Sequence, residues 1–160
     1  QALVADLAPQ VTVPLRAEAN PQAAAAQADV ICTVTGAQTP ILLDAWVRDG
    51  THLNIVGSSH AGPAEIDSPL VARARFIADS RASALAAAAE FLIAREEGLI
   101  DNDHIAGEIG EVLNGTVTGR ESPQQVTLYK SLGHIVQDLA ALTYIHALGS
   151  PHPMEASVHR

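Results

Sequence analysis

Apolar, β-branched runs that alternate with segments of helical pattern constrain the fold of this chain more than any other feature of its sequence. The clearest runs span residues 29–35, 52–56 and 75–79. The first run shows no alternation of polar and apolar residues, which is typical of a parallel strand buried on both faces. Strands that alternate with helices form βαβ units with right-handed crossovers. The sequence therefore predicts an α/β fold with a parallel sheet and flanking helices.

The segments between these strands carry signals for helix ends. Pro21 and Pro69 suit the first turn of a helix, where the missing N–H is not needed, and Ser68 is expected to cap the second of these helices. Gly98 is expected to end a long Ala-rich helix. The expected helices are residues 1–7, 20–27, 42–47, one that begins at residue 68, 82–97 and 108–113, and two further short strands are expected at residues 11–15 and 126–129.

A long last helix is expected from residue 133 to residue 148. Side chains spaced three or four residues apart give this helix one apolar face, which consists of Ile135, Leu139, Leu142 and Ile145, with His146 beside them. Such a face either covers the chain's own core or docks on another domain. Residues 150–160 are expected to form a mobile tail.

The charge and composition of the chain narrow its partners and its location. With 18 acidic and 9 basic residues, the formal net charge is −9, which would repel nucleic acid and anionic membranes. No apolar run approaches the roughly 20 residues that cross a bilayer. The single cysteine, Cys32, is expected to lie buried in the first strand, which fits a reducing compartment. The sequence thus predicts a cytoplasmic protein that binds neither nucleic acid nor membrane.

Two loops follow strands at the edge where open parallel sheets bind ligands. Residues 35–37 follow the first strand, and residues 57–63 follow the second. A glycine after a strand lets a nucleotide approach the backbone, whose N–H groups can face phosphates. Ordinary turns have the same composition, and the glycine-rich signature G-x-G-x-x-G does not occur in the chain. On chemistry alone, both interpretations stay open.

Several blocks together resemble the ornithine cyclodeaminase/mu-crystallin family, in the order and spacing of that family. They are residues 28–35, 52–57, 62–67, 79–80, 104–112, 119–120 and 127–133, followed by Gln137 and Asp138. The resemblance implies the C-terminal portion of a homodimeric, NAD(P)-dependent enzyme. The chain also begins inside a helical pattern and without an initiator Met, which suggests a fragment.

The resemblance also implies a domain organisation. Residues 1–130 would form a partial Rossmann-like NAD(P)-binding domain without its N-terminal glycine-rich unit. Residues 131–149 would form a C-terminal helix that packs toward a separate substrate and dimerisation domain, and residues 150–160 would be a tail. The strand that distinguishes NAD from NADP would precede Gln1.

Site residues follow from the same resemblance. NAD(P)H would contact residues at the ends of three strands and in the loops that follow them. Leu132 would face an imino- or amino-acid substrate. The cofactor contacts would be Thr35, Val56, Gly57, Ser58 and Ser131.

Three further polar positions carry weaker expectations. Lys130 would pair with a cofactor phosphate or a substrate carboxylate, or would be a surface or structural lysine. His60 would donate to the cofactor or substrate, or face solvent. His104, Glu108 and Glu111 match a family block that begins a helix, so no metal site is expected.

Two departures from the cyclodeaminase pattern bear on the reaction. Ser59 stands where cyclodeaminases carry an aspartate, and Pro63 stands where they carry a lysine. A serine hydroxyl does not take up a proton near neutral pH as a carboxylate does, but it can orient an imine or a water.

The loop that contains Ser59 resembles bacterial family members that reduce Δ1-pyrroline-2-carboxylate and Δ1-piperideine-2-carboxylate. The sequence therefore predicts NAD(P)H-dependent ketimine reduction to L-proline or L-pipecolate, with Ser59 as the catalytic residue. The alternatives are an ornithine cyclodeaminase, an amino-acid dehydrogenase, and a non-enzymatic small-molecule binder of the mu-crystallin kind.

Overall fold

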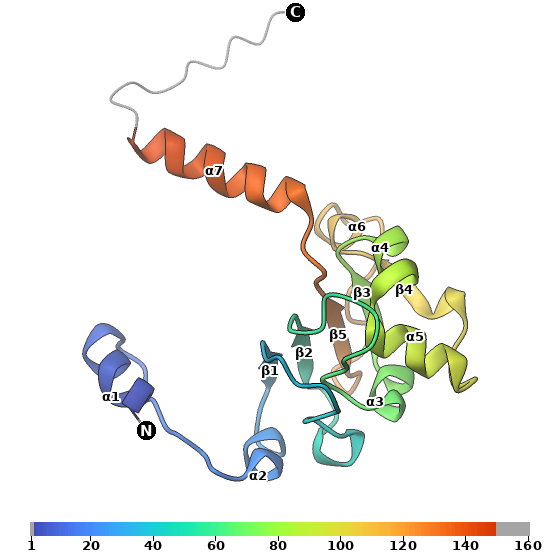
Figure 1. The fold of residues 1–160 in the computed structure, drawn as a ribbon, viewed down its shortest axis with the longest axis horizontal. Helices are drawn as coiled ribbons and strands as arrows, with labels where there is room; N and C mark the ends of the chain where they lie inside the picture. Colours follow the sequence, from blue (N-terminus) through green and yellow to red (C-terminus); the bar gives the residue numbers. More distant parts are fainter. Residues whose placement is uncertain (1, 150–160) are drawn as a thin grey trace, which may run out of the picture.

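Five parallel strands form the centre of the computed structural model, which describes residues 2–149 (Figure 1). The strands lie in the order β1-β2-β5-β3-β4, so the last strand of the sequence occupies the middle of the sheet. Because all neighbours are parallel, the carboxyl ends of β1, β2, β5 and β3 meet at one edge. The strands are β1 (Val30–Thr33), β2 (His52–Ile55), β3 (Arg75–Ala78), β4 (Ile105–Glu108) and β5 (Thr127–Lys130).

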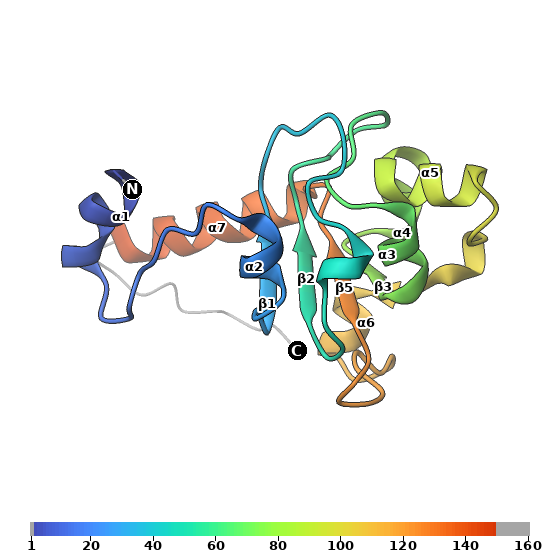
Figure 2. The same cartoon turned by 90° about the horizontal axis from the view of Figure 1, so that it is seen from below.

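Seven α-helices and three short 3-10 helices connect or flank these strands in the part of the chain that the structure describes. Helices α3, α4 and α5 gather beside β3 (Figure 2), and α5 packs on both α3 and α4. The α-helices are α1 (Ala2–Leu7), α2 (Pro21–Ala25), α3 (Ser68–Arg73), α4 (Arg81–Ala87), α5 (Ala89–Glu96), α6 (Ile109–Leu113) and α7 (Ile135–Gly149), and the 3-10 helices are η1 (Ala8–Gln10), η2 (Asp44–Trp46) and η3 (Asn102–His104).

The hydrophobic core lies between α3, α5 and one face of the sheet. Alternate residues of the strands point to this face, and their side chains are fully buried together with those of the two helices. Phe76 of β3 meets Phe91 of α5 edge to face, with ring centroids 5.4 Å apart. The largest apolar side chains of the core are Leu53, Ile55, Ile66, Leu70, Phe76, Phe91, Ile105 and Leu128.

The opposite face of the sheet is more open, which overturns one expectation. Cys32 is exposed rather than buried, because β1 is an edge strand and Cys32 points away from the core side occupied by Thr33. Its neighbours across the sheet, Asn54 and Tyr129, are only half-buried. The prediction of a first strand buried on both faces is therefore wrong.

The structure confirms an α/β fold with a parallel sheet, and it corrects several element boundaries. Residues 11–15 form no strand, since Pro14 lacks a donor and no strand lies beside them. The long helix expected over residues 82–97 is interrupted at Ala88, whose backbone is extended (ψ 100°). Only η2 forms within residues 42–47. Strand β4 was not expected, and it ends at Glu108, the first residue of the helix expected over residues 108–113.

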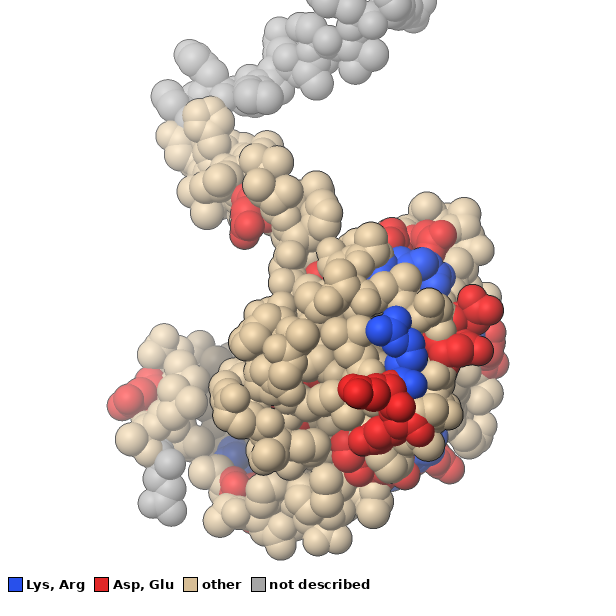
Figure 3. Space-filling view, turned by 45° about the vertical axis from the view of Figure 1, so that its right-hand side comes forward, with Lys and Arg blue, Asp and Glu red and all other residues tan. Residues whose placement is uncertain are grey.

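Helix α7 leaves the sheet (Figure 1) and is exposed to solvent along its length. None of its residues is buried, and Leu139 and Leu142 are 56% and 62% exposed. Asp138 is its only Asp, Glu, Lys or Arg, so the helix is almost uncharged in Figure 3. No helix within residues 2–149 is long and apolar enough to span a membrane. The predicted tail, residues 150–160, lies outside the described residues.

The cap of α3 gives a test of the local structure. Asp67, not Ser68 as expected, is the N-cap: its carboxylate accepts from the backbone N of Leu70 at 3.3 Å and of Asp44 at 2.9 Å. We therefore expect Asp67→Ala to lower the free energy of unfolding by about 1–2 kcal/mol. Ser68→Ala should cost less than about 0.5 kcal/mol. Urea denaturation of both variants measures the difference, and equal losses would contradict the assignment.

Candidate functional site

A single buried carboxylate joins the loops that follow β1 and β2. Glu65 has none of its surface exposed, and its Oε2 accepts hydrogen bonds from Thr33 Oγ1 at 2.7 Å and from the backbone N of Gly57 at 2.8 Å. Its Oε1 accepts two more from Thr35, through N and Oγ1, both at 2.7 Å. Four donors on one carboxylate hold the two loops against each other.

The hydrogen bonds also decide the charge of Glu65. Burial alone would raise the pKa of this carboxyl, but the donors from Thr33, Thr35 and Gly57 outweigh burial and hold the pKa below its usual range. The group is therefore ionised near neutral pH. A negative charge with its oxygens engaged inside the fold serves to position the loops rather than to accept a proton from a substrate.

Gly57 is enclosed so tightly that only glycine fits. A Cβ at this position would overlap the carbonyl oxygen of Thr35 and the carboxylate of Glu65. Gly36, in the loop after β1, is the opposite case, because a Cβ there would meet nothing within 4 Å. Neither glycine has a positive φ, so surrounding space alone distinguishes them.

Behind the β2 loop lies a second buried cluster that consists of Ser58, Glu90 and Lys130. Lys130 Nζ donates to Ser58 Oγ at 2.8 Å, and Ser58 Oγ donates in turn to Glu90 Oε1. Glu90 Oε1 also accepts from the backbone N of Glu65 at 3.1 Å. Glu90 Oε2 lies 3.1 Å from Nζ as an ion pair, yet it accepts no hydrogen bond from the described residues. Burial lowers the pKa of Lys130, and the neighbouring charge of Glu90 opposes this shift.

Asp79 positions the third loop, which follows β5. Its Oδ2 accepts from the backbone N of Leu132 at 2.6 Å and of Gly133 at 3.0 Å. The backbone N of Ser131 donates to Ile55 O at 3.1 Å, which ties this loop to the end of β2. The loops after β1, β2 and β5 therefore form one continuous edge.

The predicted site residues lie along this edge, and all but one of them are exposed or half-buried. Thr35, Val56 and Ser59 are exposed, and Gly57, Ser131 and Leu132 are half-buried. Ser58 exposes 1% of its surface, so direct contact with a cofactor would require the loop to move. The structure brings the loops that carry the predicted residues together at one edge, and the sequence gave no depth for the individual side chains.

The buried groups that hold the edge were not anticipated from the sequence. Glu65 and Asp79 lie within the blocks that carry the family resemblance, and Glu90 lies in an Ala-rich helical pattern. Lys130 was left open between a ligand contact and a surface or structural residue, and it proves to be fully buried. The one available signal was the position of Lys130 at the end of a predicted strand, because a charged side chain that is buried there needs a partner.

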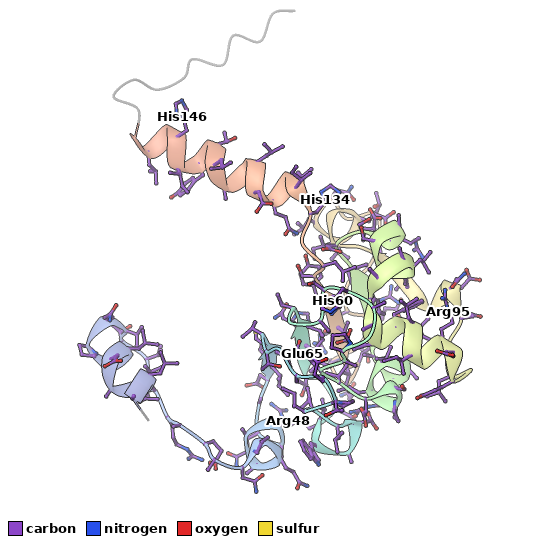
Figure 4. The ribbon with its side chains drawn as sticks, in the orientation of Figure 1. Arg48, His60, Glu65, Arg95, His134 and His146 are labelled. Atoms are coloured by element: carbon purple, nitrogen blue, oxygen red, sulfur yellow. The ribbon has the colours of Figure 1, made fainter. Side chains whose placement is uncertain are left out.

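The other polar candidates have separate places. His60 is exposed in the loop of residues 57–63, whereas Figure 4 shows His134 at the start of α7 and His146 near its far end. His104 Nε2 lies 2.8 Å from the carbonyl oxygen of Val71. Glu108 and Glu111 form a capping box at the start of α6. Each of the last three therefore has a structural partner.

Comparison with known proteins yields a consistent set of matches. The family model for the ornithine cyclodeaminase/mu-crystallin family matches residues 2–149. The Δ1-pyrroline-2-carboxylate reductase of Paracoccus denitrificans is 33% identical over 131 residues, which are 82% of this chain and 42% of that protein. The ketimine reductase mu-crystallin of Mus musculus is 37% identical over 125 residues, 78% of this chain and 37% of that protein.

A solved structure matches at the level of the fold as well. It is the Δ1-pyrroline-2-carboxylate reductase of Thermococcus litoralis in complex with NADH and L-proline, with a TM-score of 0.74 and 34% sequence identity. The match covers 79% of this chain and 40% of that one. The chain thus spans about two-fifths of the length of these relatives.

The two loop glycines form a matched pair for testing the tight packing at the edge. We expect Gly57→Ala to lower the free energy of unfolding by about 1–3 kcal/mol, because the added methyl group overlaps backbone and a buried carboxylate. Gly36→Ala should change it by less than about 0.5 kcal/mol, since the methyl group enters open space. Thermal and urea denaturation compare the two, and a harmless Gly57→Ala would show that the loops are not held together as described.

The ionised state of Glu65 predicts a pH dependence of stability. Because its pKa is lower in the folded state than in the unfolded state, its contribution is fully present above the unfolded pKa, about 4.3. The contribution is lost as the pH falls through the folded pKa. Glu65→Gln should lower the free energy of unfolding at pH 7 by about 1.5–3 kcal/mol, the scale of one hydrogen bond to a charged group. In the variant, the free energy of unfolding should also fall less steeply as the pH is lowered. Denaturation between pH 3 and pH 7 measures both effects, and parallel profiles would contradict them.

Proposed function

The chain belongs to the ornithine cyclodeaminase/mu-crystallin family, and from this premise we propose that it is the C-terminal portion of an NAD(P)H-dependent ketimine reductase. The proposed substrates are the cyclic imines Δ1-pyrroline-2-carboxylate and Δ1-piperideine-2-carboxylate, and the products are L-proline and L-pipecolate. The observation that carries the proposal is the continuous edge formed by the loops after β1, β2 and β5. Its support comes from relatives that are named as reductases of this kind.

The edge offers part of the surface that a dinucleotide would contact. Val56, in the loop after β2, exposes 40% of its surface, and a Cβ at Gly36, in the loop after β1, would meet no atom within 4 Å. We assign cofactor contacts to Thr35, Val56, Gly57 and Ser131. Ser58 is left out of this set because its side chain is buried beneath the loop. When bound, NAD(P)H would supply the hydride for the imine carbon.

Ketimine reduction requires little acid–base catalysis by the protein. A protonated cyclic ketimine is already electrophilic, so the protein chiefly positions the hydride donor and the imine relative to each other. Ser59 is exposed at the edge, where its hydroxyl would orient the imine nitrogen or a water. Leu132, on the neighbouring loop, would pack against the substrate.

The same residues weigh against cyclodeamination. Ser59 and Pro63 occupy the positions of the aspartate and lysine that cyclodeaminases carry. Of the carboxylates that hold this edge, Glu65 and Glu90 are buried, and Asp79 accepts hydrogen bonds from the backbone of Leu132 and Gly133, so none of the three replaces the missing aspartate as a free, exposed base.

The apolar face of α7 suits an interdomain contact. Its leucines and isoleucines are exposed in the described chain, and exposed patches of this kind mark interaction surfaces. We propose that α7 packs on the substrate and dimerisation domain of a homodimer, which the length of the relatives leaves room for. The proposed location is the cytoplasm.

Ser59 separates the reaction classes. In the full-length enzyme, Ser59→Ala should raise the barrier to ketimine reduction by about 1–3 kcal/mol, the scale of one hydrogen bond to a charged group, which is a roughly ten- to hundred-fold loss of rate. Ser59→Asp should not create ornithine cyclodeamination, because Pro63 and the substrate pocket would also have to change.

The assay follows NAD(P)H oxidation with each of the two cyclic imines, beside proline formation from ornithine. The wild-type enzyme should consume the imines and leave ornithine unchanged. Efficient conversion of ornithine by a wild-type enzyme that is inactive on both imines would refute the proposed function.

A further inference from the structure

A buried ion pair lies directly behind the loop to which we assign the cofactor. Lys130, at the end of the central strand β5, is completely buried, and Glu90 in α5 is 2% exposed. They are joined by Ser58, whose hydroxyl accepts from Lys130 and donates to Glu90. The pair thus reaches the β2 loop through a single side chain.

Glu90 is also connected to the β1 loop. Its Oε1 accepts from the backbone N of Glu65, and the Glu65 carboxylate holds Thr35 and Gly57. One oxygen of Glu90 therefore positions Ser58 directly and fixes the backbone that carries the carboxylate joining both loops. The connections run from β5 and α5 to two of the loops that form the site.

Stability alone gives no reason for a buried pair of this kind. Removing two charges from water costs several kcal/mol for each ion, and apolar replacements of similar volume are often neutral or stabilising. The contact between Lys130 and Ser58 does not make Ser58 a nucleophile, because Ser58 exposes only 1% of its surface in this loop conformation. What remains is the geometry that the pair imposes on the loops.

We propose that Glu90 and Lys130 are positioning residues that hold the loop of residues 57–59 in the conformation required for hydride transfer. Glu90 supplies the acceptor for Ser58 and for the Glu65 backbone, and Lys130 provides the positive charge that keeps the Glu90 carboxylate in place. The proposal rests on the proposed function, which gives Gly57 a contact with the cofactor and Ser59 a role in orienting the imine. Neither residue touches substrate or cofactor.

Two double variants of the full-length enzyme separate positioning from stability. Lys130→Met/Glu90→Leu removes both charges and the acceptor, whereas Lys130→Met/Glu90→Gln removes both charges but keeps an acceptor oxygen. We expect both to unfold within a few degrees of wild type. The Leu variant should lose roughly ten- to hundred-fold in kcat, as expected for misplaced reacting groups, with KM for the imine changed less than about threefold. The Gln variant should retain most of kcat. Glu96→Gln, an exposed change in the same helix, is the control.

Hydrogen exchange of residues 57–60 in the same variants measures the loop without relying on catalysis. Exchange should be faster in the Leu variant than in the Gln variant. Equal exchange and equal kcat in the two, or losses that follow the melting temperature, would overturn the positioning role. Wild-type enzyme that is inactive on both imines would overturn the proposed function instead, and the exchange comparison would still decide the positioning role.

If the double variants do not fold, Ser58→Ala provides the same test. It removes the hydroxyl between loop and pair and leaves the Lys130–Glu90 contact of 3.1 Å in place. Reduced kcat with faster exchange of residues 57–60 and little change in melting temperature would support the proposal. Unchanged kcat and exchange would refute it.

Discussion

The carboxylate of Glu65 is the interaction on which the rest of the site depends. It lies where two strands end, and it satisfies backbone donors of both following loops. Loops that lack regular structure leave N–H groups to be paired by other partners. One ionised side chain solves this problem for Thr35 and Gly57 together. The close approach of these loops then excludes any side chain at Gly57.

The position of β5 explains how the remaining groups reach this site. Because the last strand enters between β2 and β3, Lys130 comes to lie beside Ile55 in the register of the sheet. Ser58, three residues beyond Ile55, meets Lys130 although 72 positions separate them in the chain. The loop after β5 is then fastened to Asp79 at the end of β3. The strand order thus brings polar residues from distant segments of the chain into contact behind the edge.

The sequence predicted those parts of the fold that depend on local pattern. Strands β1, β2, β3 and β5 follow from apolar runs, and α7 follows from its spacing of Leu and Ile. Strand β4 was missed because Gly107 and Glu108 give it little apolar character. The strand expected near Pro14 failed because pairing requires a neighbour, which local sequence does not supply. The partners of Glu65, Glu90 and Lys130 lie far away in the sequence. No local pattern therefore predicts that these three residues act together.

Strand β1 has a paired side and a side without a neighbouring strand among the described residues. An unpaired edge offers backbone N–H and C=O groups to any extended peptide, and sheets with such edges join one another in water. The uncovered side of α7 adds an apolar surface of different character. A preparation of the 160-residue chain by itself therefore has two routes to self-association, one through the backbone and one through side chains. We therefore expect its behaviour in solution to depend on protein concentration, because dilution opposes assembly but not the folding of a single chain.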